Sequence, residues 1–160
     1  KGKLPEQLPT DRAFGLITAF DVIEHVADDA AALKVIREIV EPSGYFMGTV
    51  PAYQFLWSGH DVINEHKRRY TKKELVQKLE QSGFRVIKCS YYNFFLFPVA
   101  LLFKVYSKLR WKSQAKAHSE TVPSAFINTP MKWIFSAEKF LLPYFNFPFG
   151  VSIIFIAVQK

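Results

Sequence analysis

Three short apolar runs in the first 91 residues predict β-strands at residues 14–20, 45–50 and 84–91. The first run, FGLITAF, is almost uninterrupted and too short for a helix. A run of this kind fits a strand that is buried on both faces, as strands are in a parallel sheet. The pattern therefore predicts a sheet whose strands are joined by the segments between the runs.

The segments between these runs carry helical patterns. Residues 29–40 place apolar side chains at positions i, i+3 and i+7, and Asp28 supplies an oxygen that can cap the helix. A turn at residues 42–44 is expected to end this helix. Residues 71–82 begin with the spacing Thr71–Glu74, which is typical of a capping box. The order strand–helix–strand–helix–strand is typical of an α/β protein.

The second half of the chain is rich in aromatic residues. Residues 92–111 are predicted to be helical after Pro98, residues 113–124 form a polar linker, and a second aromatic helix is expected over residues 129–142. Residues 151–159 are rich in β-branched side chains and predict a last strand. The chain is therefore expected to carry a helical insertion between its third and last strands.

Composition narrows the class of protein without selecting a partner. With 49% apolar and 22% charged residues, the sequence is typical of a globular domain and not of a disordered chain. The single cysteine, Cys89, excludes an internal disulfide and favours a reducing, cytoplasmic location. The net charge of +7 suits nucleic acid, an anionic membrane surface or an acidic ligand. Residues 140–158 carry no charge, but Pro143 and Pro148 argue against a membrane-spanning helix.

Polar residues suited to catalysis or binding follow the first two predicted strands. Asp21, Glu24 and His25 come directly after the first strand, with spacings that put them on one face of a helical turn. Residues 60–70, which include His66, follow the second strand. Because ligands bind beyond the carboxyl ends of parallel strands, we expect both clusters at the same rim of the sheet.

Four segments, in this order, resemble one enzyme family. The family is the class I S-adenosylmethionine-dependent methyltransferases, whose second half is similar to AFDVIEHVADD, EPSGYFMGTVPA, HDVINEHKRRYTKKEL and QSGFRV. Within that family, the segments are most similar to the group that includes the ubiquinone-biosynthesis O-methyltransferases. The terminal PFGVSIIFIAVQK resembles the last, antiparallel strand of this group. The resemblance covers residues 14–160 and is least specific over residues 92–146.

The resemblance implies an α/β fold with a seven-stranded, Rossmann-like sheet, of which this chain supplies strands four to seven. Residues 1–91 would form the core of a partial methyltransferase domain, residues 92–149 a helical lid or substrate insertion, and residues 150–160 the final strand. The family's glycine-rich cofactor loop has no counterpart among the scattered glycines, and we expect it before Lys1. The chain alone is therefore expected to be inactive. Gly15 also departs from the family, which usually has aspartate there.

The resemblance also implies roles for particular residues. Phe20, Asp21 and Val22 match the loop that lines the methionine part of S-adenosylmethionine, although Phe20 and Val22 are equally well explained as packing residues. Methyl transfer needs the acceptor aligned with the methyl carbon, and a hydroxyl acceptor also needs a base. His25 is the first candidate for that base and His66 the second, because histidine accepts protons near neutral pH.

Two interpretations stay open at this rim. Arg69 and Tyr70 are the candidate substrate-binding residues, and the basic run at residues 67–69 either clamps an anionic substrate or belongs to a solvated loop. His25 is either the general base or a histidine at the start of a helix that is hydrogen-bonded to Glu24 or to the backbone. No metal is assigned, although four residues resemble the metal-ligand pattern of small-RNA 2′-O-methyltransferases: Asp21, Glu24, His25 and His66.

We expect the parent protein to methylate a small, lipid-like acceptor at oxygen, with the aromatic insertion as a lid. A helix of that insertion either lies at a membrane surface, which would make the protein membrane-associated, or is an ordinary lid or core helix. The alternative from another class is a non-catalytic binding or assembly module on the same scaffold, with RNA as the ligand, but the basic residues are dispersed. The open edge of the strand at residues 14–20 is expected to pair in a homodimer or with an earlier segment of a longer chain.

Overall fold

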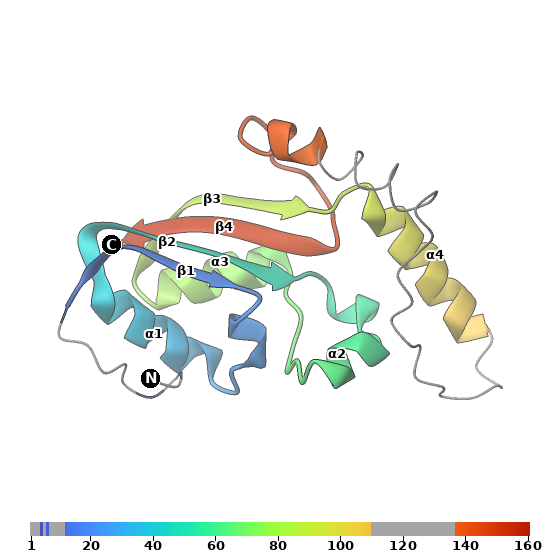
Figure 1. Ribbon diagram of the computed structural model, residues 1–160, viewed down its shortest axis with the longest axis horizontal. Helices are drawn as coiled ribbons and strands as arrows, with labels where there is room; N and C mark the ends of the chain where they lie inside the picture. The colour runs from blue at the N-terminus through green and yellow to red at the C-terminus, as the bar shows by residue number, and fades with distance from the viewer. Residues whose placement is uncertain (1–3, 5, 7–11, 110–136) are drawn as a thin grey trace.

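A four-stranded sheet forms the centre of the computed structural model, which describes residues 4, 6, 12–109 and 137–160 (Figure 1). The order of the strands in the sheet is β1-β2-β4-β3. β1 and β2 are parallel, whereas β4 lies antiparallel between β2 and β3. The strands are β1 (Phe14–Phe20), β2 (Val40–Pro51), β3 (Phe84–Tyr92) and β4 (Ser152–Gln159). The predicted α/β class and the antiparallel last strand are confirmed.

Helices connect the strands and cover one face of the sheet. α1 joins β1 to β2, α3 joins β2 to β3, and both lie on the same side of the sheet in Figure 1. The predicted caps are present, because Asp28 accepts the N–H of Ala31 at 2.9 Å and Thr71 forms a capping box with Glu74. The helices are α1 (Asp29–Ile39), α2 (Gly59–Ile63), α3 (Lys72–Gln81) and α4 (Leu96–Leu109), with single 3-10 turns at Ile23–His25 and Gln54–Leu56.

The hydrophobic core lies between the sheet and these two helices. Alternate residues of β4 point into it, as the period of two in a strand requires. Phe155 of β4 packs edge-on against Phe46 of β2, with ring centroids 5.1 Å apart. A Cβ on Gly48 would lie 2.5 Å from the carbonyl oxygen of Ala19, so only glycine lets β1 and β2 approach this closely. The sheet-to-helix packing thereby fixes the strand ends that carry the site.

Two predicted boundaries were wrong. Residues 42–44 do not form a turn before the second strand, because β2 already begins at Val40 and its register against β1 shifts over this segment. Pairing with β1 and burial of Val40 outweigh the local turn preference of the segment. α4 begins before Pro98 and not after it, since proline is tolerated in the first turn of a helix, where no N–H is needed.

The remaining predictions for the second half are tested only in part. The predicted linker at residues 113–124 and most of the helix at 129–142 lie outside the described residues, although residues 137–141 are helical. Within the described ranges, the helices are too short or too polar to cross a lipid bilayer.

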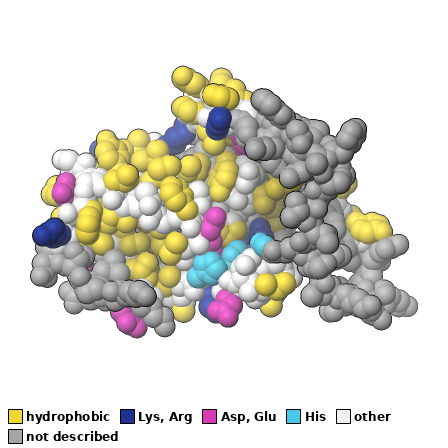
Figure 2. All heavy atoms as spheres, viewed as in Figure 1, with side chains coloured by type: hydrophobic (Ala, Val, Ile, Leu, Met, Phe, Trp, Pro, Cys, Tyr) yellow, Lys and Arg dark blue, Asp and Glu magenta, His cyan; other side chains and the backbone are white. Residues whose placement is uncertain are grey.

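The prediction that the strand at residues 14–20 is buried on both faces is wrong for the described residues: β1 lies at the edge of the sheet, and its apolar side chains are largely exposed. Leu16 is 58% exposed, and its register partner Tyr45 on β2 is also exposed. Figure 2 shows hydrophobic side chains gathered over this part of the molecule. An open apolar edge can template pairing with another strand. The expected pairing of this edge, in a homodimer or within a longer chain, stays a prediction.

Candidate functional site

The end of β1 is tied to β2 through Asp21. This residue has a left-handed backbone with φ of 50°, a conformation that aspartate tolerates better than most residues. Its N–H donates to the carbonyl oxygen and to Oγ1 of Thr49, each at 3.1 Å, and the Thr49 hydroxyl donates back to Asp21 Oδ1 at 3.0 Å. The backbone at the predicted cofactor loop is therefore fixed by β2.

The neighbours of Asp21 in the predicted cofactor loop point away from the core. Phe20 is 51% and Val22 39% exposed. Within the described residues their side chains are accessible, either to a ligand or to a segment that would pack against the open edge of β1. Their contact with a cofactor stays a prediction.

A 3-10 turn after β1 turns Glu24 inward. The side chain is fully buried, and neither carboxyl oxygen has a hydrogen-bond partner among the described residues. Burial raises the pKa of Glu24 to about 7, and the nearby carboxylate of Asp21 contributes in the same direction. The nearest ionisable partner is His25, whose Nε2 lies 4.0 Å from Glu24 Oε1. This distance is too long for a hydrogen bond.

The loop after β2 is organised around a second buried carboxylate, Asp61. It accepts the N–H of Ser58 at 2.7 Å, Nδ1 of His66 at 2.9 Å, and Nε and Nη2 of Arg69 at 2.8 and 2.9 Å. Burial alone would raise the pKa of Asp61, but these donors, Arg69 above all, hold it at about 2. Asp61 is therefore ionised throughout the physiological range.

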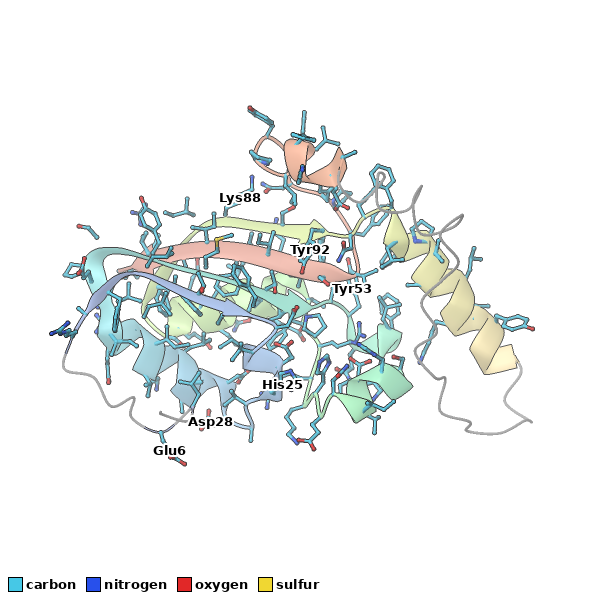
Figure 3. The ribbon with its side chains drawn as sticks, in the orientation of Figure 1. Glu6, His25, Asp28, Tyr53, Lys88 and Tyr92 are labelled. Atoms are coloured by element: carbon cyan, nitrogen blue, oxygen red, sulfur yellow. The ribbon has the colours of Figure 1, made fainter. Side chains whose placement is uncertain are left out.

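The two polar clusters meet at one rim of the sheet, as the sequence predicts. The rings of His25 and His66 lie edge to face with centroids 4.7 Å apart. One ligand atom from each of Glu24, His25 and His66 lies within 4.8 Å of the others. Figure 2 shows histidines beside acidic side chains, and Figure 3 shows His25 near the strand ends. A cavity of about 400 Å³ opens here, and its lining includes Asp21, His25, His60, Asn64, His66 and Arg69.

Two residues of the basic run at 67–69, Arg68 and Arg69, are held by protein partners, whereas Lys67 is exposed. Arg68 binds Asp29 at 3.0 Å, and Arg69 binds Asp61 and also donates to the carbonyl oxygen of Ala52 at 3.1 Å. Arg69 lines the cavity, so its predicted contact with a substrate stays open, although its guanidinium already has protein partners.

Tyr70, the other predicted substrate-binding residue, lies in the core. Its ring is only 2% exposed, and its hydroxyl donates to Asp29 Oδ2 at 2.8 Å. Lys78 binds the other oxygen of Asp29 at 2.8 Å. In this structure Tyr70 joins the loop to α1, and the geometry lends no support to its predicted contact with a substrate.

Replacing Tyr70 with phenylalanine is expected to lower the free energy of unfolding by about 1 to 2 kcal/mol, because a buried hydrogen bond to a charged group is lost while the ring is kept. Chemical denaturation measures the change. The matched control is Tyr45→Phe, since Tyr45 is exposed on β2. Equal stability of the two variants would contradict the role given to the Tyr70 hydroxyl.

Sequence reasoning missed two features of the site. The sequence does not show that Glu24 is buried without a partner, because this depends on the loop after β2 closing over it. The sequence places Asp61 in the cluster at residues 60–70 without assigning it a role. The sequence signal for a structural role of Asp61 is the spacing Ser58–Asp61, which matches an N-cap residue followed by an acidic residue at N3. The structure contains this capping box at the start of α2.

Comparison with known proteins identifies the class. The chain matches the family described as "Methyltransferase domain" over residues 3–89, which is more than half of its length. The chain therefore belongs to the methyltransferase domain family. A "Probable S-adenosylmethionine-dependent methyltransferase" of Mycolicibacterium smegmatis is 31% identical over 87 residues, which are 53% of this chain and 34% of that protein. The predicted family and its cofactor, S-adenosylmethionine, are confirmed at the level of the family.

Solved structures share the fold at low identity. The complex between the Haloferax volcanii Trm112 methyltransferase activator and a methyltransferase aligns with a TM-score of 0.55 and 14% identity, over 98% of this chain and 58% of that one. The glycopeptide N-methyltransferase MtfA with S-adenosylmethionine aligns with a TM-score of 0.51 and 13% identity. The alignment covers 100% of this chain and 63% of MtfA. These likenesses confirm the Rossmann-like methyltransferase fold. The chain spans about a third of the curated relative and less than two thirds of these structures.

Proposed function

We propose that the protein containing this chain transfers a methyl group from S-adenosylmethionine to an oxygen atom of a small, lipid-like acceptor. The observation that carries the proposal is the pair of histidines, His25 and His66, that meet beside a cavity at the carboxyl ends of β1 and β2. Ligands of open α/β sheets bind at this rim. The family supplies the cofactor, and the histidines supply a group that can take the proton of a hydroxyl.

The cofactor would lie against the end of β1. The fixed backbone of Asp21 and the accessible side chains of Phe20 and Val22 suit contacts with the methionine part of S-adenosylmethionine. The glycine-rich loop for the rest of the cofactor would precede Lys1, and the chain alone would then lack activity. S-adenosylmethionine supplies a methyl group on a sulfonium, so the residues of this chain need only align the acceptor and remove its proton.

Aromatic side chains beside this rim suit an apolar acceptor. Tyr53, which follows β2, stacks on Tyr91 and on Phe55 with ring centroids 5.0 Å apart in each pair. Phe97 of α4 approaches Tyr53 at 5.6 Å. The cluster links the loop after β2 to the aromatic insertion, which supports the insertion as one wall of the acceptor site.

A divalent metal ion at Glu24, His25 and His66 is a second candidate for the same site. The observation in its favour is the buried carboxyl of Glu24, which has no hydrogen-bond partner in the part of the chain that the structure describes and lies within 4.8 Å of both imidazoles. Carboxylate and imidazole are suitable ligands for such an ion, which would polarise an acceptor hydroxyl when bound. Among the described residues, Asp21 lies outside this group of ligand atoms, and its carboxylate accepts a hydrogen bond from Thr49.

Titration calorimetry with S-adenosylmethionine tests the proposal. The protein carrying the segment proposed before Lys1 is expected to bind the cofactor. Thr49→Val is expected to weaken binding about tenfold, because both hydrogen bonds between the Thr49 hydroxyl and Asp21 are lost. Thr18→Val is the matched control, since Thr18 is exposed on β1. Absence of binding at millimolar cofactor would contradict the proposed activity.

A further inference from the structure

We propose that Asp61 is a positioning residue that holds the proton of neutral His66 on Nδ1 and leaves Nε2 as the accepting nitrogen at the cavity. The proposal deepens the proposed function, because it selects His66 over His25 as the base. The hydrogen-bond arrangement that carries it does not depend on the reaction.

The contact between Asp61 and His66 defines the tautomer. Oδ1 of Asp61 lies 2.9 Å from Nδ1 of His66, and the carboxylate also accepts bonds from Arg69 and Ser58. An ionised carboxylate can only accept hydrogen bonds, so Nδ1 must carry the hydrogen in this contact. A neutral imidazole has one N–H, and the lone pair therefore lies on Nε2, on the opposite side of the ring.

His66 is attached to Asp61 at two points. Besides the ring contact, the backbone N–H of His66 donates to the backbone carbonyl of Asp61 at 2.9 Å. Asp61 is itself held by two parallel bonds from Arg69, whose Nη1 is anchored on Ala52 at the end of β2. The imidazole is therefore fixed relative to the sheet, and its orientation does not depend on a bound ligand.

His25 has no comparable support among the described residues. The carboxyl of Glu24 is 4.0 Å from His25 Nε2, beyond hydrogen-bond distance, and the His25 side chain is more exposed than that of His66. The order of the two candidate bases from the sequence is therefore reversed. His66 has the defined tautomer and orientation that a general base requires, and His25 packs against its ring.

Nitrogen-detected NMR of the histidine rings tests the tautomer directly. In the metal-free protein at a pH where His66 is neutral, we expect protonated Nδ1 and unprotonated Nε2. In Asp61→Asn, the amide can rotate and donate to Nδ1, so an Nε2–H population is expected to appear. Asp28→Asn, the same change at the exposed cap of α1, is expected to leave the His66 signals unchanged. A wild-type Nε2–H tautomer would overturn the proposal, even if Asp61→Asn fails to fold.

Activity gives a second, separate measurement. If methyl transfer is observed, Asp61→Asn is expected to lower kcat about 10²-fold while the KM for S-adenosylmethionine changes less than about twofold. The double variant Asp61→Asn, His66→Asn should have the same kcat as His66→Asn alone, because Asp61 acts through His66. If the losses of the two single variants add in the double variant, the proposal is overturned. The expected tautomer without any methyl transfer would support the role of Asp61 and contradict the proposed function.

Discussion

Replacing Glu24 with glutamine is expected to raise the free energy of unfolding by about 3 kcal/mol at pH 8 and to change it little at pH 4. Glu24 is fully buried without a hydrogen-bond partner among the described residues, and burial raises its pKa from 4.5 to about 7. Ionising it in the folded protein therefore costs about 1.4 kcal/mol for each unit of this shift. Glutamine has nearly the same shape and never carries that charge.

The pH dependence has a definite sign. As the pH rises above about 4.5, the unfolded chain releases the proton of Glu24 while the folded chain keeps it, so the wild type loses stability up to about pH 7. Above that pH both states are ionised and the loss is complete. The variant lacks this contribution, and the gap between the two proteins should widen between these pH values and then stay constant.

Chemical denaturation over this pH range, with a chelator present, measures the effect. Glu38→Gln is the matched control, because Glu38 is exposed on α1 and should show no such trend. A difference between Glu24→Gln and the wild type that is the same at pH 4 and pH 8 would show that the buried carboxyl does not titrate as the structure requires.

Replacing His66 with glutamine is expected to reduce methyl transfer about 10²- to 10⁴-fold, because the proposed base is removed. Binding of S-adenosylmethionine, measured by calorimetry, should be nearly unchanged. His60→Gln is the comparison: His60 lines the same cavity but is exposed and lies outside the group of Glu24, His25 and His66, so its loss should be less than about tenfold. Equal losses in the two variants would contradict a specific role for His66.

A chelator separates the two candidate roles of His66. If His66 acts as a base, wild-type activity survives exhaustive chelation. If it is a metal ligand, chelation abolishes activity and added divalent ions restore it, and His25→Gln should then be as damaging as His66→Gln. The buried Glu24 makes the second outcome chemically reasonable, because a bound cation would stabilise its ionised form.

The sequence predicts the order of elements here because that order rests on local patterns. The uninterrupted run of β1 and the Thr71–Glu74 capping box are both visible within a few residues. The errors arise where pairing between residues that are far apart in the sequence determines the local structure. At residues 42–44, pairing with β1 makes the segment part of β2. The meeting of the two histidines followed from the general rule for strand ends, but the inward turn of Glu24 and the bonds of Asp61 depend on how the loop after β2 closes.

The position of β4 has a consequence for how the molecule is made. β4 separates β2 from β3, so until residues 152–159 have left the ribosome β3 has no neighbour among the four strands and β2 has only β1. Of these four strands, a growing chain can until then pair only β1 with β2, and the apolar residues that pack against β4 stay uncovered. We therefore expect β3 to join the sheet only after β4 has been made, and the apolar surface exposed until then to be prone to aggregation.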